Sequence, residues 1–290
     1  MPDNRIGYLF PGQGAQFVGM GRDLYEPFPA AKKIFEEADS VLGYSLSRTC
    51  FEGPEEELTR TRIAQPAIFI TSLAALKVFQ EKFPHLKPAF AAGLSLGEFT
   101  ALVAAGSLDF KEGLTLVKKR AEAMETAAAN HPGTMASMIG LTPEQCEKIA
   151  EEAKCQVANF NSPDQTVLSG TAETIEKACQ IAESRGAKRA MRLKVGGAFH
   201  SSLMQEAKDA LKQALNSSRI QRTLVDPSHM RHHGQFPIGL IHGHLGPPFD
   251  LADLHGAPGP FIQQFHQPFV DGIDLVSPEL YVHGFPCRYA

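Results

Sequence analysis

Short apolar runs alternate with amphipathic segments along the chain, and this alternation predicts a mixed α/β fold. Two apolar runs lead directly into glycine-containing turns, as buried strands do; they span residues 5–10 and 88–92. Apolar residues recur at helical spacing in three long segments, which span residues 30–41, 65–83 and 109–128. Pro66 favours a start of the second helix at Gln65. Asp109, with Glu112 three residues later, is an N-cap signal for the third.

Residues 131–195 show a second pattern, in which strand and helix signals follow the order βαββαβ. The expected strands span residues 134–140, 156–160, 166–170 and 188–195. One expected helix spans residues 142–153, and the other begins at residue 171 or 172 and ends at residue 185. This order is that of a ferredoxin-like subdomain. We therefore predict an insertion at 131–195 within a discontinuous α/β core formed by residues 1–130 and 196–216, with a last helix at 201–216.

The composition of the chain changes at about Ser217. Residues 217–290 contain no lysine, whereas the first 216 residues contain fifteen, and they hold eight of the eleven histidines. Proline and glycine recur every few residues, and no helical periodicity is sustained. This atypical tail has the composition of an out-of-frame translation or of a disordered segment. The alternative is a metal site built from His229, His232, His233, His242 and His244, although no regularly spaced carboxylate or cysteine ligands accompany them.

Bulk properties exclude several classes of protein. A length of 290 residues, 43% of them hydrophobic, is enough for one large domain with an insertion. The net charge of −4 offers no basic surface for nucleic acid. No apolar run reaches ~18 residues and no signal peptide is evident, so we expect no membrane span. Five scattered cysteines without a C-x-x-C pair are typical of free thiols. We expect a cytoplasmic protein.

One turn has the pattern of a nucleophilic serine. Gly93-Leu94-Ser95-Leu96-Gly97 fits G-x-S-x-G, and it lies between the second apolar run and an alanine-rich helical segment. The two glycines leave room for a sharp turn that holds the hydroxyl at a helix N-terminus, where developing negative charge is stabilised. The pattern favours Ser95 as a nucleophile. The alternative is an ordinary turn with a capping serine.

A serine hydroxyl needs an adjacent base, and His200 is the candidate. Only three histidines precede the tail, and His85 and His131 lie in polar stretches close to prolines, as loop residues do. His200 follows the glycine pair 196–197 after a predicted strand, where α/β folds place functional side chains. The alternative is a histidine with a structural role only.

A second glycine-rich turn, at residues 11–14, also follows a predicted strand. Its backbone N–H groups could face an anion, as in an oxyanion hole. It lacks the Gly-Lys-Ser/Thr of a phosphate-binding loop. An ordinary turn is the alternative here too.

Taken together, six segments resemble the malonyl-CoA:acyl carrier protein transacylase family. They occur in the family's order and at near-family spacing: FPGQGAQ (10–16), IAQPA (63–67), GLSLGE (93–98), Arg120 with Met124, NFNSPDQTVLSG (159–170) and GAFHSSLM (197–204). The resemblance covers residues 5–215. It implies an α/β-hydrolase-like core around the ferredoxin-like subdomain.

The resemblance also implies a role for each matched residue. Ser95 would form the acyl-enzyme, and His200 would take its proton and then deprotonate the incoming thiol. Backbone N–H groups of Gln13 and Leu96 would form the oxyanion hole. The residues implied to bind the acyl group are Arg120, which would pair with the malonyl carboxylate, and Gln65, Met124 and Phe199. A fixed guanidinium left unpaired by acetyl would reject neutral acyl groups. Phe199 resembles the bulky residue of malonyl-selective family members, whereas relatives that take methylmalonyl have a small residue there, so the resemblance implies malonyl over methylmalonyl.

The implied activity is malonyl transfer from malonyl-CoA to the phosphopantetheine thiol of acyl carrier protein, for fatty acid synthesis, by a ping-pong serine acyltransferase. The implied partners are a coenzyme A thioester and acyl carrier protein, and we expect a monomer without cofactor or metal. An acidic carrier protein needs a basic docking face. Candidate cations are Lys118, Lys119, Lys188, Arg189, Arg192 and Lys194; scattered solvated charges are the alternative.

The sequence departs from the family pattern at two places. Leu94 stands where the family usually has histidine, and we expect only a tuning effect because this neighbour is not the base. The family's Q-x-x-x-P-V segment, whose carbonyl orients the catalytic histidine, has only a weak counterpart at 264–268. Two alternatives therefore stay open beside the acyltransferase. One is a serine hydrolase or thioesterase with the same dyad, against which Arg120 argues, and the other is a product impaired by the loss of C-terminal core elements.

Overall fold

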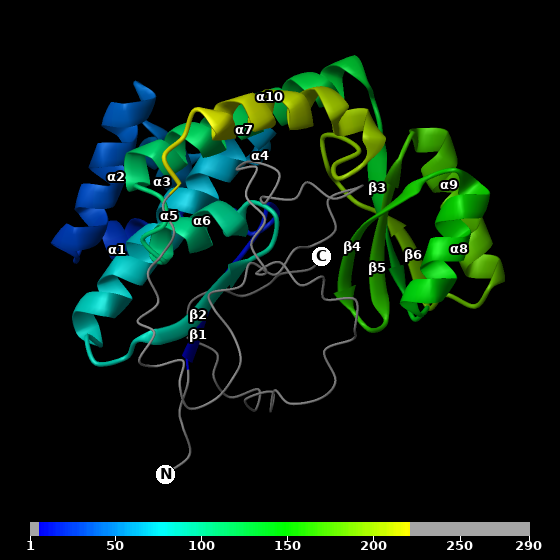
Figure 1. Cartoon of the computed structure of the whole chain (residues 1–290), viewed down its shortest axis with the longest axis horizontal. Coiled ribbons are helices and arrows are strands. Elements are labelled where there is room, and N and C mark those ends of the chain that lie inside the picture. Colours follow the sequence, from blue (N-terminus) through cyan, green and yellow to red (C-terminus); the bar gives the residue numbers. More distant parts are fainter. Residues whose placement is uncertain (1–5, 221–290) are drawn as a thin grey trace, which may run out of the picture. The chain divides into compact units, whose positions relative to one another are not determined.

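The computed structural model describes residues 6–220 (Figure 1). In chain order the elements are β1 (Ile6–Phe10), α1 (Arg22–Tyr25), α2 (Pro29–Leu42), α3 (Leu46–Glu52), α4 (Glu55–Thr59), α5 (Thr61–Lys82), β2 (Pro88–Gly93), α6 (Gly97–Ala104), α7 (Phe110–Asn130), β3 (Thr134–Ile139), α8 (Pro143–Ala153), β4 (Gln156–Ser162), β5 (Gln165–Gly170), α9 (Ala172–Ser184), β6 (Arg189–Arg192), the 3-10 turn η1 (Ser202–Met204) and α10 (Gln205–Asn216). The strands and long helices predicted from the apolar pattern are all present. The short helices α1, α3 and α4 carry too few turns for the pattern to predict them. The histidine-rich tail lies outside the described residues from residue 221 onward.

β1 and β2 pair in parallel, with Tyr8 opposite Ala91 and Phe10 opposite Gly93. α6 follows β2 and contacts both strands. Because the carboxyl ends of parallel strands meet at one edge of a sheet, the loops after Phe10 and Gly93 lie side by side. A hydrogen bond from Leu94 N–H to the Phe10 carbonyl, at 3.2 Å, joins the two loops.

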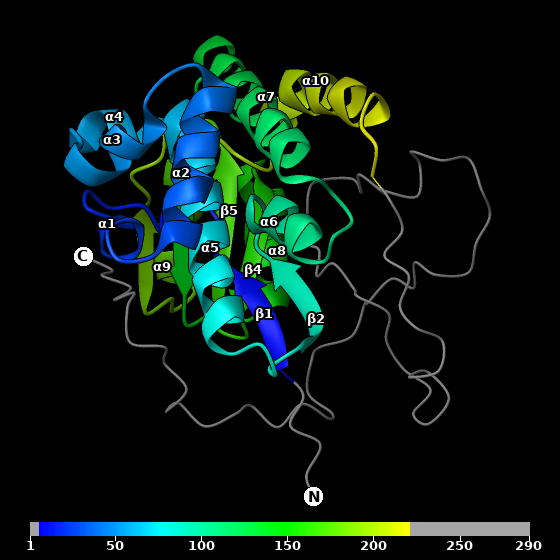
Figure 2. The same cartoon turned by 90° about the vertical axis from the view of Figure 1, so that its left-hand side faces the viewer.

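α5 is the core helix of this part of the chain, and it lies between α2 and α7 (Figures 1 and 2). The predicted start at Gln65 is wrong: α5 begins at Thr61, and Pro66 lies inside it. The first turn forms because Ala64 N–H bonds to the Arg60 carbonyl, while the Arg62 N–H donates to the Glu125 carboxylate of α7. Tertiary contacts therefore supply the helix start that the local sequence lacks.

α5 has the length and apolar composition of a membrane span. The lengths of the apolar runs in the sequence lead us to expect no such helix. Within the described part of the chain it is the one helix with these properties. Its most apolar stretch is 67% buried by the rest of the protein. Burial by neighbouring helices is typical of a core helix, which explains the apolar composition without a membrane.

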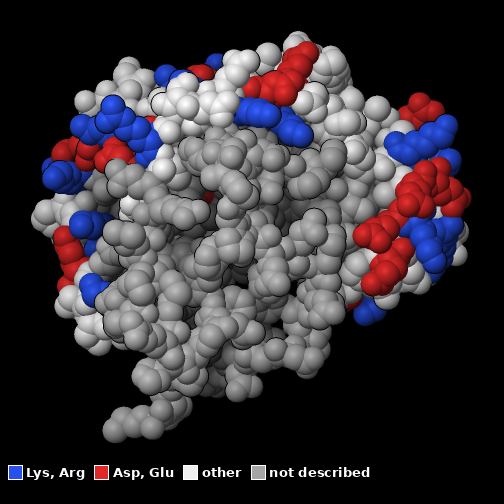
Figure 3. Space-filling view, in the orientation of Figure 1, with Lys and Arg blue, Asp and Glu red and all other residues white. Residues whose placement is uncertain are grey.

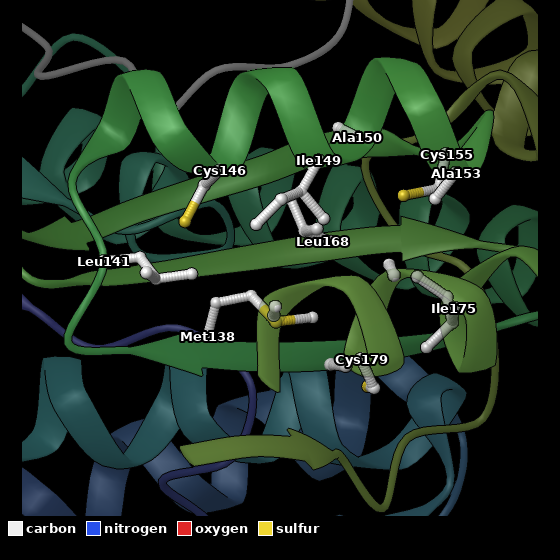
Figure 4. Packing of buried hydrophobic residues seen from close by; sticks show 13 residues of the cluster. Met138, Leu141, Cys146, Ile149, Ala150, Ala153, Cys155, Leu168, Ile175 and Cys179 are labelled. Atoms are coloured by element: carbon white, nitrogen blue, oxygen red, sulfur yellow. The ribbon is translucent and has the colours of Figure 1, made fainter. Parts of the chain in front are cut away.

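The second sheet is antiparallel throughout, with the strand order β4-β5-β3-β6. α8 and α9 cover one of its faces, and their apolar side chains meet those of β3 and β5 in a closed cluster (Figure 4). Met138, Ile149, Leu168 and Ile175 are fully buried there. The reciprocal capping box between Thr142 and Gln145 fixes the start of α8.

After β6 the chain returns to the first part of the structure, and α10 packs along α7 (Figures 1 and 2). The apolar cluster formed there joins Met124 of α7, Met135 of β3, Phe199 and Met204. The segment that holds His200 is thus packed between α7 and the antiparallel sheet. The expected helix at 201–216 is divided into η1 and α10.

Candidate active site

Ser95 occupies a strained turn between β2 and α6. Its φ is 52°, in the left-handed region that residues with a Cβ rarely adopt. The flanking glycines are sterically required: a Cβ on Gly93 would lie 2.0 Å from the carbonyl carbon of Gly97, and one on Gly97 would lie 2.3 Å from the Phe10 carbonyl oxygen. The turn therefore matches the sharp serine-bearing bend that the motif predicts.

Ser95 and His200 meet although 105 positions separate them in sequence. Ser95 Oγ lies 3.0 Å from His200 Nε2, which is hydrogen-bonding distance. His200 also has a left-handed backbone, with φ 57°. The hydroxyl of Ser201 donates to the Ala198 carbonyl at 2.6 Å and closes the turn that presents the imidazole. The structure thus brings the serine and the histidine of the predicted pair into contact.

The environment of His200 keeps its imidazole neutral. Burial, and to a smaller extent the nearby positive charge of Arg120, lower the pKa of His200 to about 4. A neutral imidazole can accept the hydroxyl proton of Ser95, so this histidine is available as a base throughout the neutral pH range. The other two histidines of the described chain lie elsewhere, and His131 pairs on the surface with Glu206.

Arg120 is buried in α7 and reaches Ser95 directly. Its Nη2 donates to Ser95 Oγ at 2.6 Å, and its Nη1 donates to Gln65 Oε1 at 2.6 Å. The guanidinium carbon lies 5.8 Å from the centre of the Phe99 ring. Burial lowers the pKa of Arg120 to about 10, and the negative charge of Glu98 opposes that shift, so Arg120 stays charged. It is not the solvated helix residue that its position alone would suggest.

A chain of side-chain hydrogen bonds fixes Arg120 to the loop after β1. Gln65 Nε2 donates to Gln13 Oε1 at 3.2 Å, and it also contacts Met124 Sδ at 3.3 Å. Gln13 Nε2 in turn donates to Thr61 Oγ1 at 3.2 Å. Gln65 and Met124, predicted to lie at the acyl site, are therefore next to the arginine.

Two candidate backbone donors lie in the neighbouring loops that follow β1 and β2. Gln13 is in the loop after β1, and Leu96 is the N-cap residue of α6. Within residues 6–220 neither backbone N–H has a hydrogen-bond acceptor. Unpaired N–H groups at a helix N-terminus are suited to stabilising an oxyanion.

The sequence missed two buried polar residues at the site. Thr61 holds the Gln13 amide, and Glu98 lies one residue after the G-x-S-x-G motif. Burial raises the pKa of Glu98 to about 7, against the opposing effect of Arg120. Both residues lie in or beside the segments that resemble the family. That resemblance is the sequence signal that could have identified them. Leu94, the departure from the family pattern, is 43% exposed.

Phe199 and the basic residues have different surroundings. Phe199 is buried against Met124. Lys119, Lys188, Arg189, Arg192 and Lys194 are exposed. Over α8 and α9, at the right of Figure 3, residues of both charge signs are interspersed and no area of one sign forms. Residues 6–220 contain no group of three His, Cys, Asp or Glu side chains that could hold a metal ion. The histidines at 229–244, which the sequence offered as an alternative metal site, lie outside that range.

Several known proteins of one family resemble this chain. The acyl transferase domain model matches residues 7–230. The malonyl CoA-acyl carrier protein transacylase of Bacillus subtilis (strain 168) is 48% identical over 223 residues, which are 75% of this chain and 70% of the relative. The solved transacylase of Clostridium perfringens superposes with a TM-score of 0.71 at 38% identity, covering 75% of this chain and 69% of that one.

A further solved structure shows a malonyl-transacylase in complex with a type II PKS acyl-carrier protein. It superposes with a TM-score of 0.72 at 40% identity and covers 74% of this chain and 71% of that one. The matched family model extends over more than half of this chain. The chain therefore belongs to the acyl transferase family that contains the malonyl-CoA–acyl carrier protein transacylases.

Proposed function

We propose that this chain transfers a malonyl group from malonyl-CoA to the phosphopantetheine thiol of acyl carrier protein, and thereby supplies fatty acid synthesis. One observation carries the proposal: a single oxygen, Ser95 Oγ, contacts both a neutral imidazole and a buried guanidinium. The first contact supplies a base, and the second supplies a partner for a substrate carboxylate. The names of the relatives agree with this substrate pair.

The reaction proceeds in two half-reactions through a seryl ester. Ser95 Oγ bonds to the thioester carbon, its proton passes to His200 Nε2, the carbon–sulfur bond breaks, and the coenzyme A thiolate takes that proton. In the second half, His200 removes the proton of the carrier thiol, whose sulfur attacks the ester, and the proton returns to Ser95. The N–H groups of Gln13 and Leu96 bind the oxyanion in both halves.

Arg120 selects an acyl group that carries a carboxylate. It is buried and fixed by Gln65, and a desolvated guanidinium binds a carboxylate in a bidentate manner. A neutral acyl group leaves that charge without a counter-ion. Phe199, packed beside Met124, limits the space next to the methylene carbon, which favours malonyl over methylmalonyl.

The domain division follows the two sheets. Residues 1–130 and 196–216 form an α/β-hydrolase-like core, and residues 131–195 form a ferredoxin-like subdomain inserted in it. The strand order β4-β5-β3-β6, antiparallel throughout, with two helices on one face, supports this assignment. The protein acts as a cytoplasmic monomer without a cofactor, and exposed cations such as Lys188 and Arg189 meet the acidic carrier protein.

The direct test is to incubate the full chain with malonyl-CoA and locate the malonyl group by peptide mass spectrometry. We expect it on Ser95, and we expect its transfer to holo-acyl carrier protein. Ser95→Ala and His200→Ala should each lower the transfer rate by at least about a thousandfold. Matched controls are Ser202→Ala, an exposed hydroxyl in the same loop, and His131→Ala, a surface imidazole; both should transfer at the wild-type rate.

A result in which malonate is released to water faster than it reaches the carrier would identify a hydrolase instead. Malonyl found on a residue other than Ser95, with Ser95→Ala active, would rule out the proposed nucleophile. A thermal melt of each variant separates lost chemistry from lost folding.

A further inference from the structure

Ser95 Oγ is already occupied on two sides in the substrate-free protein. Its distance to Arg120 Nη2 is 2.6 Å, shorter than the 3.0 Å to His200 Nε2. A hydroxyl has one proton and two lone pairs. With its proton directed at the imidazole, one lone pair accepts from the guanidinium. The group expected to bind the substrate therefore binds the nucleophile while no substrate is present.

This contact opposes the attack on a thioester. A charge-assisted hydrogen bond withdraws electron density from the oxygen that must attack, and the guanidinium occupies space beside that oxygen. The same positive charge disfavours the imidazolium that forms when His200 takes the serine proton. Arg120 thus restrains both members of the Ser95–His200 pair.

We infer that Arg120 Nη2 is an exchangeable donor, which binds Ser95 Oγ in the free protein and moves to the acyl carboxylate when malonyl-CoA enters, so that the exchange releases Ser95 for attack. This inference rests on the proposed malonyl transfer. It assigns Arg120 a part in the chemical step as well as in binding. A neutral acyl group of the same size cannot draw the guanidinium away.

The geometry is suited to such an exchange. Nη1 is held at 2.6 Å by Gln65, whose amide is fixed in turn by Gln13, so the guanidinium can pivot about a retained bond. The malonyl carboxylate is one methylene group from the carbonyl carbon that Ser95 attacks. A donor that now contacts Oγ is therefore within a small movement of that carboxylate. After the exchange Ser95 Oγ bonds to the thioester carbon, its proton goes to His200, and coenzyme A leaves as the thiol.

The test compares two thioesters of nearly equal shape, malonyl-CoA and acetoacetyl-CoA. In acetoacetyl-CoA a methyl ketone stands at the position of the malonyl carboxylate. The rate of Ser95 acylation is measured by quenched-flow mass spectrometry at saturating and at limiting thioester. We expect the saturating rate of the wild-type chain to be at least about tenfold higher with malonyl-CoA, the factor that one charge-assisted hydrogen bond is worth.

In Arg120→Met we expect acetoacetyl-CoA to acylate Ser95 faster than in the wild type, while malonyl-CoA loses its advantage. The matched control is Arg48→Met, which removes an exposed arginine paired with Glu52 and should change neither rate. If Arg120→Met does not melt cooperatively, the wild-type comparison still decides, because it needs no variant.

Two results would overturn the inference alone. In the first, the wild-type chain transfers malonyl, but the two thioesters acylate Ser95 at the same saturating rate. They then differ only in the concentration that gives half of that rate. The other is a folded Arg120→Met chain that acetoacetyl-CoA acylates more slowly than the wild type. A wild-type chain that malonyl-CoA does not acylate at all would instead overturn the proposed function, and the inference with it.

Discussion

Ser95 and His200 share an unusual backbone conformation as well as a hydrogen bond. Both have positive φ, at 52° and 57°, and this costs a residue with a Cβ roughly 1–2 kcal/mol. The surrounding contacts must supply that energy: glycines leave room on each side of Ser95, and the Ser201 hydroxyl closes the His200 turn. Strained residues that meet at one point are typical of a functional site.

The pH dependence of acylation follows from the environment of His200. Burial and, to a smaller extent, Arg120 together lower its pKa to about 4. The base is therefore neutral at every pH well above 4 in the free enzyme. We expect kcat/KM for malonyl-CoA, which reports the free enzyme, to be constant from about pH 8 to 5 and to reach half its value near pH 4. An acidic limb near the ordinary histidine value of about 6.5 would contradict the described environment.

The same group links stability to pH. The folded-state pKa of His200 lies below the value of about 6.5 that an unfolded chain has. The unfolded state therefore binds more protons between these two values. The contribution of His200 to the free energy of unfolding is complete above about pH 6.5 and decreases as the pH falls toward 4.

At the scale of elements, the site depends on the close approach of the β2–α6 turn to the end of β1. A Cβ on Gly97 would lie 2.3 Å from the Phe10 carbonyl oxygen, which is backbone and cannot rotate away. We expect Gly97→Ala to cost at least about 2 kcal/mol of unfolding free energy and to lower acylation of Ser95 by more than tenfold. Urea denaturation and the acylation rate measure the two effects.

The control for this substitution is Gly196→Ala. Among residues 6–220 only the Thr61 hydroxyl lies near its added Cβ, at 4.0 Å, so stability should change little. Equal stability of Gly97→Ala and wild type would show that β1 and the turn are farther apart than the structure places them.

The sequence predicted those elements and residues whose causes are local. Apolar periodicity placed the strands and long helices, and glycine spacing predicted the Ser95 turn. The start of α5 was predicted wrongly because its cause, the Glu125 carboxylate of α7, lies 63 positions from Arg62. The roles of Thr61 and Glu98 were missed for a similar reason, since each depends on partners that only folding brings near.

At the scale of the whole described chain, the two sheets supply different halves of the site. Ser95, the proposed nucleophile, follows β2 of the parallel pair, and His200, the proposed base, follows β6, the last strand of the antiparallel sheet. Arg120 lies on α7, which leads from the first sheet to the second. Ser95 and His200 therefore keep their distance only while the second sheet holds the segment that carries the histidine.

One side chain makes that connection directly. Gln156 of β4 accepts a hydrogen bond from the Ser202 N–H at 2.6 Å, two residues after His200. We expect Gln156→Leu to lower kcat by about tenfold, because a small displacement of the imidazole weakens proton transfer, while KM for malonyl-CoA changes less than about twofold. Gln156→Glu keeps an acceptor oxygen and should restore kcat.

The matched control for Gln156→Leu lies in the same sheet. Gln165 of β5 donates to the Ser137 hydroxyl and, within residues 6–220, makes no side-chain hydrogen bond to the His200 segment. Gln165→Leu should lower the melting temperature to a similar extent but leave kcat unchanged. If both leucine variants reduce kcat equally, or if Gln156→Glu fails to restore it, the second sheet supports the site only through overall stability. A selective loss with Gln156→Leu, recovered by glutamate, would show that the sheet positions the catalytic base through this one bond.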